Sequence, residues 1–283
     1  MKIGVLHPGE MGSSIGDCLL QSRHEVFWAS AERSKASRDR AVSWQDRSTL
    51  SELVEEVEAI FSVCPPSEAR TLAKEVCDFG FSGIYVDANA IAPQTASEIL
   101  TDFGTSYVDG GLIGPPARQK GSTRLYLSGE FASEVGSWFE GSLLDVKVIT
   151  TEMGVQASSL KMAYAGYTKG SSALLILINA FAELAGVRES LIKEWELSQP
   201  DLLRKSEQAA KGTAAKAWRF VGEMEEIAKT MNSSDLPEGF HKASAELYSL
   251  MAQFKDAKTP DLDEVLQEII CLRNKQYTCS LNF

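Results

Sequence analysis

The feature that most constrains the fold is a short apolar strand that runs into a glycine-containing turn and then into a helix start. The strand is Ile3 to Leu6, and Gly9 and Gly12 follow it closely, while His7 stands where the first glycine of a full GxGxxG would be. Glycines let the backbone approach a phosphate, and a helix N-terminus offers free N–H groups and a positive dipole end. Such a turn can also be a surface turn or a tight packing corner. We expect it to hold a dinucleotide pyrophosphate through His7, Pro8, Gly9, Glu10, Met11 and Gly12.

Composition excludes several classes of partner. The chain has 283 residues and a formal net charge of -11, which argues against nucleic acid and anionic membranes as partners. The first residues enter a strand without a leader pattern, so we expect a cytoplasmic protein. The most apolar stretch, Leu174 to Ala182, is shorter than the roughly 20 residues of a membrane helix and is interpreted as a buried helix. The scattered cysteines indicate reduced thiols, and no histidine or cysteine spacing predicts a metal site.

The pattern of apolar residues changes near the middle of the chain. Short apolar runs alternate with helical periods up to Ile149, which predicts a Rossmann-like α/β domain with a mostly parallel sheet over residues 1–152. The remainder, 153–283, is predicted to be all-α, with a cleft for a small-molecule substrate between the two halves. The predicted strands are 2–6, 25–28, 59–63, 83–87, 105–109, 123–128 and 145–150. The predicted helices of the second half are 156–186, 189–196, 201–230, 241–253 and 262–274.

The end of the second predicted strand bears on the choice between NAD and NADP. An acidic residue there would bind the ribose 2′-hydroxyl and repel a 2′-phosphate. Ser30, Arg33 and Ser34 can instead donate to a phosphate, so we expect NADP, although Glu32 keeps NAD open. The arginines could also form a solvated helix face. Two further strand ends, with Cys64 and Pro65 on one and Asn89 on the next, are expected beside the nicotinamide.

Four stretches together resemble the β-hydroxyacid dehydrogenase superfamily, which includes 6-phosphogluconate and 3-hydroxyisobutyrate dehydrogenases. Residues 4–12 look like the GFIGLGxMG opening of that family, and residues 87–93 look like its DxSTxxP loop. Residues 109–115 fall where the family has DxPVSGG, and residues 158–165 fall where it has the GxxxKxxxN helix. The resemblance covers most of the chain and is closest to divergent members with their own C-terminal domain.

The resemblance implies roles for the residues in these stretches. Lys161 would be the acid/base that protonates or deprotonates the reacting oxygen, and the substrate would contact Gly111, Leu112, Ile113 and Gly114. Ile113 and Ala165 replace the family's serine and asparagine, so the substrate need not be a standard 3-hydroxy acid. A lysine on an arbitrary helix is usually exposed, and the family register alone assigns it this role. Tyr164 and Thr168 share its helix face and are expected to orient the substrate oxygen; they could also be packed residues.

Two residues of the second half are candidates for an anionic group of the substrate. Arg219 could bind such a group in place of the missing serine, and Glu223 could hold Arg219 four residues along the helix. An ordinary surface ion pair is the alternative. The small and apolar residues of the long helix predict close packing, most simply in a homodimer, although burial within one chain would also satisfy them.

The sequence therefore predicts an oxidoreductase that prefers NADP and transfers hydride at a carbonyl or hydroxyl carbon of a small, anionic substrate. One alternative on the same scaffold is imine reduction, in which Tyr164 would matter more. Another is a module that binds NADPH without turnover.

Overall fold

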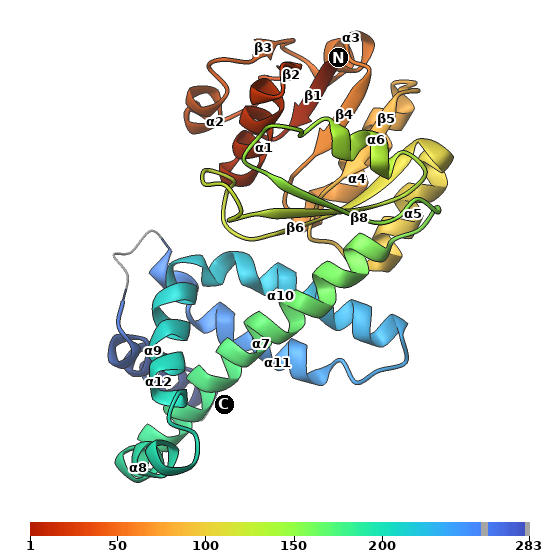
Figure 1. Ribbon diagram of the computed structural model, residues 1–283. Coiled ribbons are helices and arrows are strands. Elements are labelled where there is room, and N and C mark those ends of the chain that lie inside the picture. The colour runs from red at the N-terminus through yellow and green to blue at the C-terminus, as the bar shows by residue number, and fades with distance from the viewer. Residues whose placement is uncertain (256–259, 281–283) are drawn as a thin grey trace. The chain divides into compact units, whose positions relative to one another are not determined.

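The computed structural model describes residues 1–255 and 260–280, with the backbone alone for 273–280. The chain forms two compact units, Met1–Met162 and Ala163–Phe283. Each unit has its own secondary-structure class, as Figure 1 shows: strands and helices alternate in the first, and the second is helical. The predicted succession of an α/β domain and an all-α region is confirmed.

The first unit is built on one eight-stranded sheet of order β3-β2-β1-β4-β5-β6-β7-β8. All neighbouring strands are parallel except β6 and β7, which are antiparallel, so the prediction of a mostly parallel sheet is confirmed. The strands are β1 (Lys2–Leu6), β2 (Glu25–Trp28), β3 (Gln45–Asp46), β4 (Ala59–Ser62), β5 (Ile84–Asp87), β6 (Tyr107–Ile113), β7 (Arg124–Ser128) and β8 (Asp145–Thr150).

Helices cover both faces of this sheet. They are α1 (Glu10–Gln21), α2 (Lys35–Arg40), α3 (Leu50–Glu56), α4 (Pro66–Asp78), α5 (Pro93–Phe103) and α6 (Ala132–Ser137), with a 3-10 turn at Gly104–Ser106. Successive side chains of a strand point to opposite faces, so Ile60 and Phe61 of β4 belong to two separate hydrophobic clusters, and both are fully buried. Because the central strands are buried on both faces, they are continuous apolar runs in the sequence.

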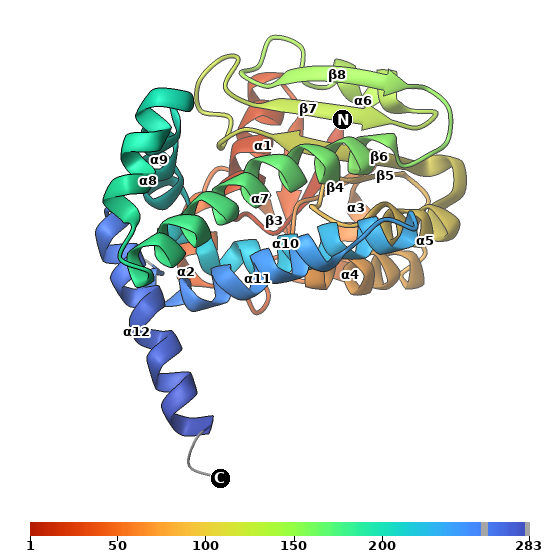
Figure 2. The same ribbon diagram turned by 90° about the horizontal axis from the view of Figure 1, so that it is seen from below.

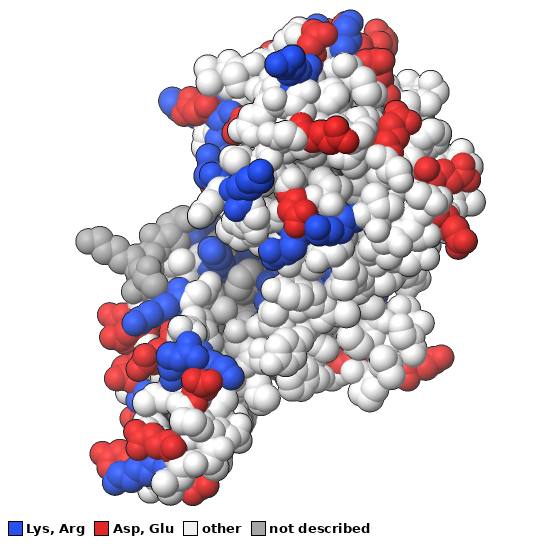
Figure 3. All heavy atoms as spheres, viewed as in Figure 1, with Lys and Arg blue, Asp and Glu red and all other residues white. Residues whose placement is uncertain are grey.

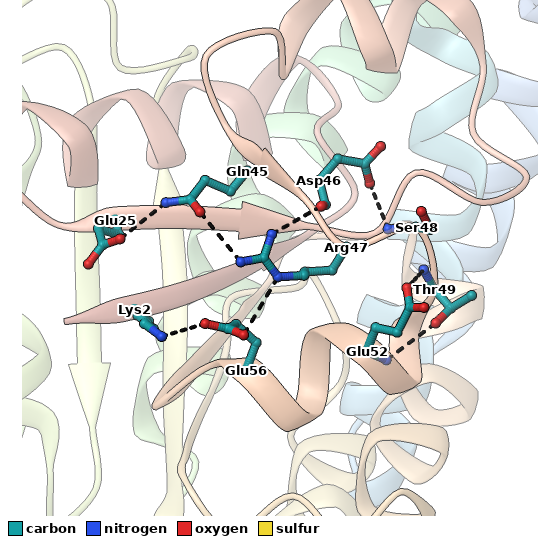
Figure 4. A network of polar contacts seen from close by, with 9 residues as sticks. All are labelled: Lys2, Glu25, Gln45, Asp46, Arg47, Ser48, Thr49, Glu52 and Glu56. Carbon is teal, nitrogen blue, oxygen red and sulfur yellow. Dashed lines mark hydrogen bonds and ion pairs between the residues drawn. The ribbon is translucent and has the colours of Figure 1, made fainter.

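The short strand β3 is absent from the predicted strands because it has only two residues and both are exposed. A polar network fixes this edge of the sheet (Figure 4). Arg47 lies 3.7 Å from Glu56 of α3, and Glu56 also pairs with Lys2 of β1. Thr49 and Glu52 form a reciprocal capping box at the start of α3. These contacts tie β1, β3 and α3 together on the exposed rim.

The helical region consists of α7 (Gln156–Leu184), α8 (Arg188–Ser198), α9 (Leu202–Thr213), α10 (Ala217–Ser233), α11 (Gly239–Leu250) and α12 (Leu262–Ser280), with 3-10 turns at Ala214–Lys216 and Ala252–Phe254. The prediction of a single helix over 201–230 is wrong, because a 3-10 turn separates α9 from α10. Gly212 and Thr213 immediately before it are poor helix formers. The Thr213 hydroxyl also bonds to the carbonyl of Ala209 within the last turn of α9.

Within the second unit, one face of α7 packs tightly and another is exposed. A side chain at Gly170 would lie 3.0 Å from the Phe240 ring of α11, so the ring would have to shift to admit one. Figure 2 shows α7 and α11 from below. A second stripe along the helix includes Leu174, Leu177 and Phe181, which are 44%, 45% and 64% exposed. The prediction that Leu174 to Ala182 form a buried helix is therefore correct for one side of the helix only. The surface along α7 carries few charged side chains (Figure 3).

Over residues 1–255 and 260–280, no helix has both the length and the apolar character needed to cross a membrane.

Candidate functional site

The turn between β1 and α1 has the shape expected for a phosphate-binding turn. Gly9 is the N-cap of α1 and has no side chain to occupy the free N–H groups of the first helical turn. A side chain at Gly12 would lie 2.3 Å from the carbonyl oxygen of His7, so only glycine fits there. A side chain at Gly9 would meet no atom within 4 Å, which means that this side of the turn is open. These residues fit the pyrophosphate of a dinucleotide.

His7 joins the end of β1 to the segment after β2. Its φ is 64°, in the left-handed region that a glycine would adopt readily. The Arg33 guanidinium lies with Nη1 2.6 Å from His7 Nε2. Burial, and then the positive charge of Arg33, lower the pKa of His7 to about 4, so the imidazole is neutral at neutral pH. His7 Nδ1 and Arg33 Nε are buried and have no hydrogen-bond partner in the described structure.

The other predicted residues after β2 are engaged by the protein itself. Ser30 is buried, and its carbonyl oxygen accepts a hydrogen bond of 2.9 Å from Arg38. The Ser34 hydroxyl caps α2 by accepting from the N–H of Ser37. Arg40 pairs with Glu10 at 2.6 Å. Arginine side chains thus gather at the end of β2, and because α2 has no buried residue, the arrangement is also compatible with the alternative of a solvated helix face.

The ends of β4 and β5 are joined by the Asn89 side chain. Its Oδ1 accepts from the N–H of Cys64 at 2.5 Å, and its Nδ2 donates to the Ser62 hydroxyl at 3.0 Å. Pro65 is the N-cap residue of α4, directly after Cys64. Burial raises the pKa of the Cys64 thiol to about 12, so it stays protonated. The structure therefore brings together Cys64, Pro65 and Asn89 at the carboxyl edge of the parallel strands, where ligands of such sheets bind.

Lys161, on the second turn of α7, donates a hydrogen bond of 2.7 Å to the carbonyl oxygen of Leu112 in β6. Burial lowers its pKa to about 8. A side chain at Gly111 would lie 2.7 Å from the Ala157 carbonyl and 3.4 Å from Lys161 Cβ, so this glycine lets α7 approach β6. Gly111, Leu112 and Ile113 belong to β6, which extends beyond its predicted end, and Gly114 follows with a φ of 126°.

A buried carboxylate that sequence reasoning missed fixes the start of α7. Asp109 of β6 accepts from the Ser158 N–H at 2.8 Å, from the Ser158 hydroxyl at 2.5 Å and from the Ser128 hydroxyl at 3.1 Å. Burial raises the pKa of Asp109 to about 6, against the effect of these donors. Asp109 and Ser158 are the first residues of two of the stretches that carry the family resemblance. Because each begins one of these stretches, the resemblance is the sequence signal that points to both residues.

Tyr164 and Thr168 follow Lys161 on α7 but belong to the second unit. Tyr164 is 48% exposed, and its backbone carbonyl accepts from the Thr168 hydroxyl at 3.0 Å. Thr168 lines a pocket of about 380 Å³ between α7 and α9. The lining includes polar residues, Lys169, Ser171, Ser172, Lys205 and Gln208, and apolar ones, Leu175, Ala209 and Phe220.

Glu223 has a different partner from the one expected. It forms an ion pair with Lys169 of α7, which also lies 4.6 Å from the centre of the Phe220 ring. The side chains of the pair are only 17% and 14% exposed. Arg219, four residues before Glu223 on α10, is exposed. The predicted pairing of Glu223 with Arg219 is therefore wrong, because the buried ammonium of Lys169 takes the carboxylate.

Within the described part of the chain, no group of three or more histidine, cysteine, aspartate or glutamate side chains has the arrangement of a metal site. The described cysteines, Cys18, Cys64, Cys77 and Cys271, are free thiols, and the Cys279 side chain lies outside the described residues.

The matching family model and the matching curated relative have no assigned activity. Residues 182–251 match the model of a domain of unknown function, DUF1932. An uncharacterized 28.5 kDa protein of Methanothermus fervidus is 28% identical over 196 residues, which are 68% of this chain and 75% of that protein.

Solved structures agree with the fold over nearly the whole chain. A conserved protein of unknown function, described as similar to 3-hydroxyacid dehydrogenases, has a TM-score of 0.68 at 23% identity, with 89% of this chain and 97% of that chain covered. The 3-hydroxyisobutyrate dehydrogenase of Mycobacterium tuberculosis has a TM-score of 0.70 at 14% identity, covering 94% and 98%. An imine reductase of Bacillus cereus has a TM-score of 0.50 at 17% identity, covering 95% and 98%. The chain has the fold of the 3-hydroxyacid dehydrogenases, which confirms the expected resemblance at the level of architecture.

Proposed function

We propose that the protein is an oxidoreductase that uses NADP(H) and interconverts a carbonyl and a hydroxyl group on a small, anionic substrate. The observation that carries the proposal is Lys161. Its ammonium is partly buried, is held at Leu112 by one hydrogen bond, and has a pKa lowered to about 8. A lysine on a surface face of the helix would not have these properties.

The nicotinamide of the bound coenzyme would supply or accept the hydride. Negative charge then develops on the substrate oxygen during reduction, and the Lys161 ammonium can donate a hydrogen bond and a proton to that oxygen. In the reverse direction the neutral amine accepts the proton. A pKa near 8 suits both directions at neutral pH, because neither protonation state is far from accessible.

The remaining roles of the site are proposed on the same basis. The turn from His7 to Gly12 would bind the pyrophosphate, and Ser30, Arg33 and Ser34 would bind the adenosine ribose and its phosphate. Cys64, Pro65 and Asn89 would lie against the nicotinamide. Gly111 to Gly114, Tyr164, Thr168, Arg219 and Glu223 would contact the substrate. Lys169 joins this last set, because it pairs with Glu223 and lines the same pocket as Thr168.

We also propose that two copies of the chain associate through the exposed stripe of α7. Large apolar side chains rarely form a continuous exposed face on a monomer, and Leu174, Leu177 and Phe181 are between 44% and 64% exposed. Lys161, Lys169 and Glu183 are the only charged residues of this long helix.

The proposed activity is tested by screening oxo acids, hydroxy acids and imines for an NADPH-linked change in absorbance. Lys161→Met should reduce turnover of an oxo acid by at least ~100-fold, the usual contribution of general acid catalysis. Lys193→Met, at an exposed lysine of α8, is the matched control and should keep full activity. The rate of reduction should fall as pH rises above about 8, where Lys161 loses its proton.

Three results would redirect the proposal. Full activity of Lys161→Met on an oxo acid would remove the role of the lysine. Turnover of imines alone would favour an imine reductase, and the structural likeness to such an enzyme supports including these substrates. Binding of NADPH without turnover of any substrate would favour a nucleotide-binding module.

A further inference from the structure

We propose that His7 is the residue that determines the preference for NADPH over NADH, because it holds the Arg33 guanidinium in place for the 2′-phosphate. The inference rests on the proposed use of a nicotinamide coenzyme. It adds a positioning role for a side chain that stands where glycine is usual.

The backbone at His7 is the first observation. A φ of 64° is unfavourable for a residue with a side chain, and glycine would avoid this strain. Strained backbone of this kind clusters at ligand sites, where the side chain compensates for it. At this position the imidazole reaches Arg33, which lies 26 residues further along the chain and follows a different strand.

The contact itself is the second observation. Arginine always donates, so His7 Nε2 must accept the 2.6 Å hydrogen bond from Arg33 Nη1. A neutral imidazole is therefore required, and burial together with the Arg33 charge favours this form. The bond orients the planar guanidinium without neutralising its charge, whereas a carboxylate in the same place would do both.

The arrangement of neighbouring arginines is the third observation. Arg40 pairs with Glu10 at 2.6 Å, and Arg118 lies 3.9 Å from the same carboxylate. Arg38 donates to the Ser30 carbonyl at 2.9 Å. In the described ranges, Arg33 has an imidazole partner and no carboxylate within ion-pair distance. Its charge therefore remains available to an anion.

The hydrogen-bond donors of Arg33 that lack a partner indicate which anion would bind. Arg33 Nε is buried without a hydrogen-bond partner, and a guanidinium binds phosphate through several N–H groups in one plane. Arg33 follows β2, whose end meets the adenosine ribose in dinucleotide-binding folds of this kind. The 2′-phosphate of NADPH supplies a dianion at that ribose, and NADH offers only a hydroxyl.

The test measures the dissociation constants of NADPH and NADH directly and so needs no substrate. Fluorescence titration is applied to the wild type, His7→Gly, His7→Asn, Arg33→Ala and the double variant His7→Gly/Arg33→Ala. Glycine adopts the left-handed backbone without strain, and asparagine tolerates it, so both variants should fold. Arg47→Ala, on the β3 edge of the sheet, is the matched arginine control.

Each His7 variant should weaken NADPH binding ~10-fold more than it weakens NADH binding, as expected for loss of one hydrogen bond to a charged group. Arg33→Ala should weaken NADPH binding more, and the double variant should lose nothing beyond Arg33→Ala, because His7 acts through that side chain. The fluorescence of the buried tryptophans during urea unfolding confirms that each variant is folded.

The outcomes separate the two proposals. Failure of the wild type to bind either coenzyme would overturn both the proposed function and this inference. A clear NADPH preference that persists unchanged in both His7 variants would overturn the inference alone. Additive losses in the double variant would show that His7 does not act through Arg33, and would also overturn it.

Discussion

Replacement of Asp87 by asparagine should make the protein more stable, and increasingly so as pH rises. Asp87 ends β5 and is only 1% exposed. Its Oδ1 accepts from the Asn89 N–H at 2.9 Å, while Oδ2 is buried without a hydrogen-bond partner. Burial is the main cause that raises its pKa from 3.8 to about 7, and the nearby charge of Asp109 adds to it.

The magnitude follows from this pKa. A carboxyl whose pKa is raised in the folded state contributes stability below pH 3.8 and loses it as pH rises through about 7. The difference between the two values corresponds to ~4 kcal/mol of penalty for the ionised form. Integration between pH 5 and pH 8 gives ~2–3 kcal/mol of that penalty. Asparagine has nearly the same shape, keeps an oxygen for the Asn89 N–H, and does not ionise.

Urea unfolding at pH 5, 6, 7 and 8 measures this effect. Trp28, Trp44 and Trp138 lie in the core of the same unit and report its unfolding by fluorescence. The advantage of Asp87→Asn over the wild type should grow by ~2–3 kcal/mol across this range. Asp39→Asn, at an exposed aspartate of α2, is the control and should follow the wild-type pH dependence. An advantage that stays constant, or falls as pH rises, would refute the burial argument.

Three further changes test other parts of the molecule. Gly12→Ala should weaken NADPH binding at least ~10-fold in a titration, because its Cβ would lie 2.3 Å from the His7 carbonyl and force the turn to shift. Asp109→Ala leaves two hydroxyls and the Ser158 N–H without their acceptor, so urea unfolding should show a loss of ~2–4 kcal/mol. Phe181→Glu places a charge on the exposed stripe of α7 and should convert a dimer to a monomer in light scattering, whereas unchanged mass would remove the stripe as the interface.

Much of the first unit could be predicted because its sequence signals are local. The strand at Lys2–Leu6 and the one at Asp145–Thr150 have the predicted bounds. Buried parallel strands are apolar runs bounded by turns, and this pattern does not depend on distant contacts. The helical half was harder, because Gly212 and Thr213 interrupt a helical period without a proline, and their effect on the backbone depends on packing.

Motifs in the sequence identified the predicted site residues. The contacts between these residues could not be predicted in the same way, because they join segments that are far apart in the sequence. The link between His7 and Arg33 joins two strand ends, and the link between Glu223 and Lys169 joins two helices. Spacing along one helix suggested Arg219 for Glu223, since residues four apart are neighbours. A tertiary contact outweighs that local preference when it removes both charges from water, because an unpaired buried ammonium would cost more than an exposed arginine left to solvent.

The role of Asp109 was not predicted either, because its contact also joins segments that are distant in the sequence. This contact matters for the site because it connects β6 to α7. In the sequence Asp109 is one acid at the start of a glycine-rich stretch, and its partner Ser158 lies 49 residues further along the chain. The longer strand brings the Leu112 carbonyl to Lys161 and the Asp109 carboxylate to Ser158 in one register. One strand thus anchors the start of α7 and holds the ammonium one turn later. A substitution that shifts β6 should therefore also shift the carbonyl oxygen that holds the proposed proton donor.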